Sequence, residues 1–97
     1  MTTADVLRAA KARISDPAKW GKGVGRHDKG QECATDAIYE ACRDLPQVDE
    51  YFKTKSAALL AFKAAINHWS IAVWNDAPQR THAEVMQAFS VAAESAS

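Results

Sequence analysis

The sequence predicts an all-α fold, with one helical domain over residues 1–97 that forms a compact bundle of about four helices. Alanine supplies 20 of the 97 residues, and alanine is the best helix former and is depleted in strands. Apolar residues in several segments recur with the 3.6-residue period of a helix. An apolar fraction of 47% is sufficient for one packed core. We also expect a long glycine-rich loop after the first helix and an extended link before the last.

The first helix is predicted over residues 3–15. Thr2 or Thr3 can cap its start through a side-chain oxygen. The helix ends at Asp16-Pro17, because a residue before proline avoids the α region. Its apolar positions share one face, which we expect to be buried: Leu7, Ala10 and Ile14.

Two central helices are predicted over residues 31–44 and 56–68. Residues 48–52 form either a separate helical turn or the start of the second of these helices. The first central helix has a buried stripe that comprises Ala34, Ala37, Ile38, Ala41 and Leu45. The second has an apolar face at positions i, i+3, i+7 and i+10, broadened by Leu60, that comprises Leu59, Phe62, Ile66 and Trp69.

The link before the last helix is predicted to be extended over residues 70–74, because Ile71 and Val73 alternate with smaller or polar neighbours. A turn over residues 75–78 follows. Thr81 and Glu84 have the T-x-x-E spacing of a capping box and mark the start of the last helix. The inner stripe of that helix comprises Val85, Phe89 and Ala92.

The charge balance bears on the class of partner. Twelve basic residues offset twelve acidic ones, whereas nucleic-acid binders usually carry a basic excess. We therefore expect another protein as the partner, with nucleic acid disfavoured and the oligomeric state left open. No apolar run has the length of a membrane span, and the N-terminus lacks the apolar core of a signal peptide. We expect a cytoplasmic protein without a membrane anchor, in which both cysteines are free thiols.

The predicted loop over residues 19–30 holds all four glycines and has a net charge of +3. Backbone amides of glycines can surround an anion, which makes Lys22 and Arg26 candidate binding residues. A nucleotide-binding loop, however, needs G-x-x-x-x-G-K-[ST] between a strand and a helix, and neither the motif nor the strand is present. The alternative interpretation, a solvated loop without a ligand, is therefore favoured.

Cys33 is the one candidate nucleophile. Near the start of a helix, exposed amides stabilise a thiolate and lower its pKa, and His27, His68 or His82 could complete a catalytic pair. The neighbouring charge of Glu32 opposes thiolate formation, and free cysteines are commonly buried. The favoured interpretation is a small core residue.

Two segments resemble a family of small uncharacterised bacterial and phage proteins. They are Trp74-Asn75-Asp76-Ala77-Pro78-Gln79-Arg80-Thr81 and the upstream Gly30-Gln31-Glu32-Cys33-Ala34. In that family a W-N-D-x-P-x-R-T turn precedes the last helix, and a cysteine opens a middle helix. The resemblance covers most of the chain, from the first helix to Val91. It implies no activity, and it draws attention to Cys33, Trp74, Asn75, Asp76 and Thr81.

Asn75 and Asp76 allow two interpretations. They could form a polar pair at the mouth of a pocket, or Asp76 could cap the turn and pair with Arg80 while Asn75 binds backbone amides. The second is favoured. We further predict that this turn packs against the first turn of the helix near Cys33, where unpaired amides need acceptors. Trp74 would then cover the small residues there, which are Cys33, Ala34 and Ala37.

The three tryptophans, Trp20, Trp69 and Trp74, could form a binding wall, but large aromatic rings in an alanine-rich chain are more commonly core anchors. The histidines and cysteines match no zinc-binding pattern, and no cofactor motif is present. Small size, balanced charge and the lack of a catalytic set predict a non-enzymatic binding or interaction module, and the resemblance implies a phage- or prophage-accessory type. A small enzyme that uses Cys33 is the alternative.

Overall fold

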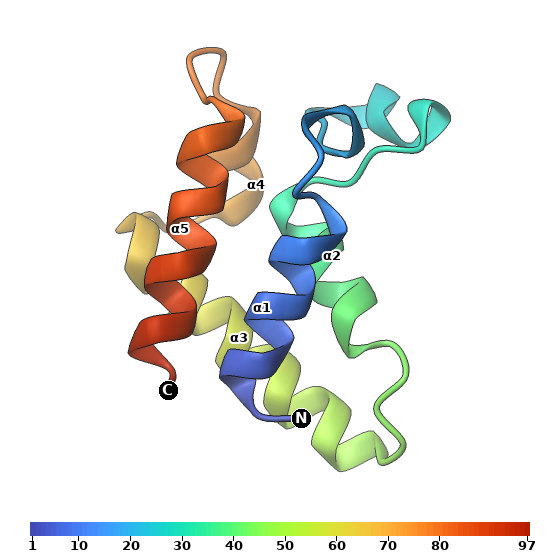
Figure 1. Cartoon of the computed structure of the whole chain (residues 1–97), viewed down its shortest axis with the longest axis vertical. Coiled ribbons are helices and arrows are strands. Elements are labelled where there is room, and N and C mark those ends of the chain that lie inside the picture. The colour runs from blue at the N-terminus through green and yellow to red at the C-terminus, as the bar shows by residue number, and fades with distance from the viewer.

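The computed structural model describes residues 1–97 and is all-α (Figure 1). The predicted bundle is confirmed, because four helices have nine residues or more and a fifth, α4, is short. In chain order the α-helices are α1 (Thr3–Arg13), α2 (Ala34–Cys42), α3 (Val48–Ile66), α4 (Ile71–Asp76) and α5 (His82–Ser95). Two 3₁₀ turns, Pro17–Lys19 and Val24–Lys29, interrupt the glycine-rich loop. None of the helices is long and apolar enough to cross a membrane.

Helix α1 occupies the middle of the bundle, with α5 on one side and α2 on the other (Figure 1). Its predicted apolar face is fully buried. Helix α3 crosses beneath and packs on α5, where the rings of Phe62 and Phe89 lie 4.6 Å apart. The core is therefore built from small alanines around a few large side chains, as the composition predicts.

Side-chain caps define the starts of α1 and α5. Thr2, the first of the two predicted candidates, caps α1 in a capping box with Asp5. The predicted box at α5 is confirmed: the Glu84 amide donates to Thr81 Oγ1 at 3.2 Å, and the Thr81 amide donates to Glu84 Oε1 at 2.9 Å. Each of these helix caps is formed by residues close together in the chain, so it can be predicted from the sequence alone.

The extended conformation predicted for residues 70–74 is wrong, because Ile71–Asp76 is the short helix α4. Ser70 caps it by accepting a hydrogen bond from the Val73 amide at 3.2 Å. Ile71 and Trp74 are both buried. Their i, i+3 spacing suits one face of a helix, and over so short a segment the apparent alternation of apolar residues did not distinguish the two structures.

Helix α3 follows one of the two predicted alternatives for its start. Residues 48–52 are its first turns, so it is one continuous helix of 19 residues. Trp69 was expected on its buried face but is 77% exposed, since α3 ends at Ile66 and Asn67 adopts a left-handed conformation that redirects the chain. Leu60 was expected to broaden that face but is 66% exposed. It lies two residues before buried Phe62, so the two point in nearly opposite directions.

Candidate functional site

Asn75, at the end of α4, is the centre of a buried polar cluster. Its side chain is fully buried. Its Oδ1 accepts hydrogen bonds from Trp20 Nε1 at 2.8 Å and from the Ala34 amide at 3.1 Å. Its Nδ2 donates to the Gly21 carbonyl at 3.2 Å and to Asp76 Oδ1 at 3.0 Å. These four bonds use the full hydrogen-bonding capacity of an amide side chain. We call these five residues the Asn75 clasp.

Local structure on both sides positions the clasp. On the α4 side, the Trp74 ring meets Phe62 edge-on at 5.8 Å between centroids, and the Arg80 guanidinium lies 4.0 Å from the Trp74 centroid. Anchoring Trp74 in this way fixes its neighbour Asn75 inside. On the loop side, an isolated β-bridge joins Trp20 to Glu32. That bridge closes the loop and carries Trp20 to the start of α2.

The glycine-rich loop is tied to the turn after α4 by two further contacts. Lys22 Nζ donates to the carbonyl oxygens of Ala77 at 2.8 Å and Pro78 at 3.3 Å. The Gly23 amide donates to Asp76 Oδ1 at 3.1 Å. Gly23 has a φ of 66°, in the left-handed region that favours glycine. The ammonium group that was a candidate for anion binding therefore binds backbone carbonyls.

Arg26 holds the loop to the first turn of α2. Its Nε and Nη2 atoms donate to the two carboxylate oxygens of Asp36 at 2.5 and 3.2 Å, and its Nη1 donates to the Gly23 carbonyl. Asp36 also accepts from the Cys33 amide at 3.1 Å. Burial raises the pKa of Asp36, but the bonds from Arg26 and Cys33 outweigh it, so the net pKa is lowered. The bond from Asp36 correspondingly raises the pKa of Arg26.

Cys33 is the N-cap of α2 and is buried. Its Sγ accepts a hydrogen bond from the Asp36 amide at 3.4 Å. Burial raises the pKa of the Cys33 thiol and outweighs the stabilisation by helix amides that was expected to lower it. His68 and His82 hydrogen-bond backbone groups elsewhere in the chain. Both burial and the raised pKa oppose a nucleophilic role. The second cysteine, Cys42, is also a buried free thiol.

The turn predicted over residues 75–78 is wrong at its start, because Asn75 and Asp76 end α4. The predicted packing of this segment against the start of α2 is confirmed by the bond from the Ala34 amide to Asn75. The predicted pairing of Asp76 with Arg80 is wrong, because Arg80 donates to Glu84 and to the Trp74 carbonyl.

The Trp74 ring contacts Phe62 and Arg80, and Trp74 belongs to the same buried core as Ala34 and Ala37 of α2. Trp20 supplies the indole N–H in the clasp. It lies 55 positions before Asn75 in the sequence, and no local pattern connects the two residues. No buried side-chain polar atom lacks a hydrogen-bond partner, and all four hydrogen-bonding positions of Asn75 are used within the protein.

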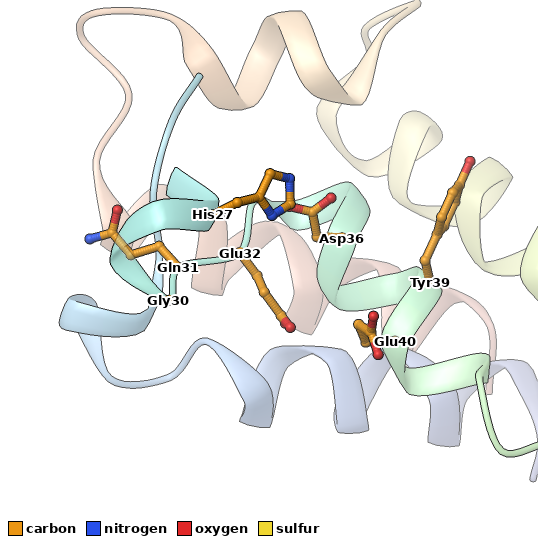
Figure 2. Close-up of a pocket in the computed structure, with 7 residues that line it drawn as sticks. All are labelled: His27, Gly30, Gln31, Glu32, Asp36, Tyr39 and Glu40. Carbon is orange, nitrogen blue, oxygen red and sulfur yellow. The ribbon is translucent and has the colours of Figure 1, made fainter. Parts of the chain in front are cut away.

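Figure 2 shows a polar hollow of about 330 Å³ beside the clasp. Glu32, Asp36 and Glu40 contribute carboxylates to its wall, with His27 at its edge. Asp36 is bound by Arg26, and Glu32 is paired with Arg13 at 2.6 Å. No three histidine, cysteine or acidic side chains are placed to hold a metal ion. Glu40 is paired with Arg43 at 3.3 Å, so all three carboxylates of this hollow already have an arginine partner.

The largest hollow, of about 470 Å³, lies between α3 and α5. Alanines form much of its wall. Its two charged side chains, Arg80 and Glu84, pair with each other at 2.9 Å. It consequently offers no unpaired charge by which to recognise a ligand.

A third hollow, of about 290 Å³, opens between α2, α3 and α4. Tyr39, Leu59 and the exposed Trp69 line it, and Lys63 is its only charged lining residue. The Trp69 ring stacks on His68 with centroids 5.6 Å apart. The tryptophan expected as a core anchor thus stands at the rim of an open apolar hollow.

Exposed apolar side chains extend from this hollow along α3. Lys55 connects them, since its Nζ lies 5.0 Å from the ring centroids of both Tyr39 and Phe52. Phe52 is 55% exposed. We define the aromatic face as the side chains Tyr39, Phe52, Leu59, Leu60, Lys63 and Trp69.

Comparison with known proteins places the chain in a family. A family of unknown function, DUF6197, matches residues 1–95. No curated protein and no solved structure matches the chain. The chain belongs to the DUF6197 family.

Proposed function

We propose that this member of the DUF6197 family is a non-enzymatic protein-interaction module that binds its partner through the aromatic face. The observation that carries the proposal is Trp69, which is 77% exposed at the rim of an apolar hollow. Tryptophan and tyrosine are enriched among the residues that dominate binding energy at protein interfaces. An accessory role of the phage or prophage type belongs to the same proposal and is motivated by the sequence resemblance.

The hydrophobic free energy available at Trp69 supports its role in binding. Covering a tryptophan side chain of this exposure would contribute roughly 4 kcal/mol of hydrophobic free energy. The fold captures little of that energy, because Trp69 lies in the link between α3 and α4 and stays 77% exposed, with its ring stacked on His68. Phe52 and Leu60 are likewise more than half exposed. Several exposed apolar side chains on one side of a helix are typical of an interaction surface.

The buried state of Cys33 also favours a non-enzymatic role. A catalytic thiol needs access to substrate and a pKa near or below neutrality, whereas the Cys33 thiol is buried with a raised pKa. Its sulfur caps α2, which gives it a structural task.

Photo-crosslinking in cells of the native host tests the proposal. A photoreactive amino acid would replace Trp69, and a matched control would carry it at Val24, which is 92% exposed on the glycine-rich loop. We expect a discrete protein adduct from position 69 and none from position 24. No adduct at position 69, or the same adducts from both positions, would contradict a specific binding surface.

A further inference from the structure

We infer that the partner on the aromatic face is a second copy of this chain, bound with its α3 antiparallel to the first. The inference rests on the proposed function and names its partner. Most soluble oligomers are symmetric, and a twofold interface requires a surface that is complementary to itself. The outer surface of α3 meets that requirement in both charge and shape.

Polar and charged residues recur along one side of α3 at a spacing of seven positions. Asp49, Ser56 and Lys63 are each seven positions apart, which is close to two turns, so they share one side of α3. Asp49 and Ser56 are exposed and Lys63 is half-buried. A twofold axis at Ser56 would place Asp49 of each copy opposite Lys63 of the other. The interface would then contain this pair of opposite charges twice.

The apolar residues obey the same symmetry. Phe52 and Leu60 lie four positions before and after Ser56 and flank the charged line on its two sides. An antiparallel arrangement therefore sets Phe52 of one copy beside Leu60 of the other. Both side chains are more than half exposed in the single chain. The small side chain of Ser56 allows the two helix backbones to approach closely at the axis.

Trp69 extends the contact beyond the end of the helix. It follows Lys63 in the chain and lines the same hollow. In the antiparallel arrangement the exposed Val48 falls opposite Ala64, so Trp69 reaches past the start of the second copy's α3. Each copy thereby covers apolar residues that are exposed on the other. Because the chain has zero net charge, two copies do not repel each other overall.

Sedimentation equilibrium on the full chain tests this inference. We expect the mass to rise from 10.6 kDa toward twice that value as concentration increases. Lys63→Glu should weaken association by about tenfold, because it opposes Asp49 with a like charge in both pairs. The double variant Asp49→Lys with Lys63→Glu should restore it. Lys29→Glu, an exposed charge change on the glycine-rich loop, is the matched control and should leave association unchanged.

A wild-type chain that stays at 10.6 kDa up to millimolar concentration would overturn the inference. So would a double variant that associates no better than Lys63→Glu. Circular dichroism on each variant checks that the helices are intact, and the restored double variant guards against a misfolded single variant. The crosslinking experiment separates the two proposals. An adduct of twice the chain mass supports both, whereas an adduct with another molecule upholds the binding surface and overturns the second copy.

Discussion

The Asn75 clasp and the aromatic face are built on opposite principles. The clasp buries an amide side chain and pairs all four of its hydrogen-bonding positions. The aromatic face leaves Trp69, Phe52 and Leu60 more than half exposed. One polar side chain, Asn75, is thus fully buried, and several large apolar side chains are exposed.

This contrast separates a region that stabilises the fold from the face that we propose binds a partner. A buried polar network is stable only when each member is satisfied, and it then holds its elements in one arrangement. The W-N-D turn, conspicuous in the sequence, belongs to this network. The face proposed to bind a partner carries no conspicuous motif. Substitutions in the two regions should therefore have opposite consequences, the first for stability and the second for association.

The largest effect is expected at Asn75. Asn75→Ala removes the partners of the Trp20 indole, the Ala34 amide and the Gly21 carbonyl while leaving them in a buried site. We expect the free energy of unfolding to fall by about 3 kcal/mol, measured by chemical denaturation. Trp69→Ala is the matched control and should change it by less than about 0.5 kcal/mol. If both variants lost the same free energy of unfolding, the clasp and the aromatic face would not differ in their contribution to stability.

The ion pair of Asp36 with Arg26 should make the clasp side sensitive to pH. Asp36→Asn is expected to cost about 2 kcal/mol at neutral pH, through bonds to a charged group. The pKa of Asp36 is lower in the folded chain than its ordinary value, so its stabilisation is complete above that ordinary value. It is lost as pH falls through the folded pKa.

Denaturation of wild type and Asp36→Asn at several pH values checks this sign. The stability difference between them should shrink between about pH 5 and pH 2. Asp5 and Glu84, whose pKa values are also lowered, are present in both proteins and cancel from the difference. If this difference in stability grew as the pH fell, the stabilising role assigned to the ion pair would be contradicted.

Asp76→Ala should have a smaller effect, about 1.5 kcal/mol, because Asp76 is exposed and only its bonds to Gly23 and Asn75 are lost. The loss should appear in the denaturation midpoint of the whole fold, since those bonds join the loop to α4. Asp28→Ala, a substitution on the glycine-rich loop, serves as the control and should leave the free energy of unfolding unchanged. A stable Asp76→Ala protein with impaired association would instead place Asp76 in the binding surface.

The smallest effect is expected from Cys33→Ser. Serine is a preferred N-cap and can accept the hydrogen bond from the Asp36 amide in place of sulfur, so unfolding should change by less than about 0.5 kcal/mol. Cys33→Val has no acceptor and should cost about 1 kcal/mol. Thermal melts of the two variants measure the difference. If serine proved as damaging as valine, capping would not be the task of this residue.

The sequence by itself determined the helical class, the capping boxes and the approach of the W-N-D turn to the start of α2. The boxes at Thr2 and Thr81 involve residues three positions apart, and helical period is a property of neighbouring positions. Unpaired amides at a helix start are equally general, which is why an acceptor from Asn75 or Asp76 could be predicted there.

Only the tertiary structure decided which acceptor was used, that residues 71–76 are helical, and that Trp69 is exposed. The bond between Trp20 and Asn75 spans 55 positions, and no local preference encodes such a distance. The short segment from Ile71 fitted two periodicities, and burial of Ile71 with Trp74 selected the helix. Trp69 is outside because the left-handed Asn67 ends α3 before the apolar period reaches it. For Asn75 and for α4 the deciding free energy comes from contacts between segments far apart in the chain, whereas the exposure of Trp69 follows from the backbone of Asn67.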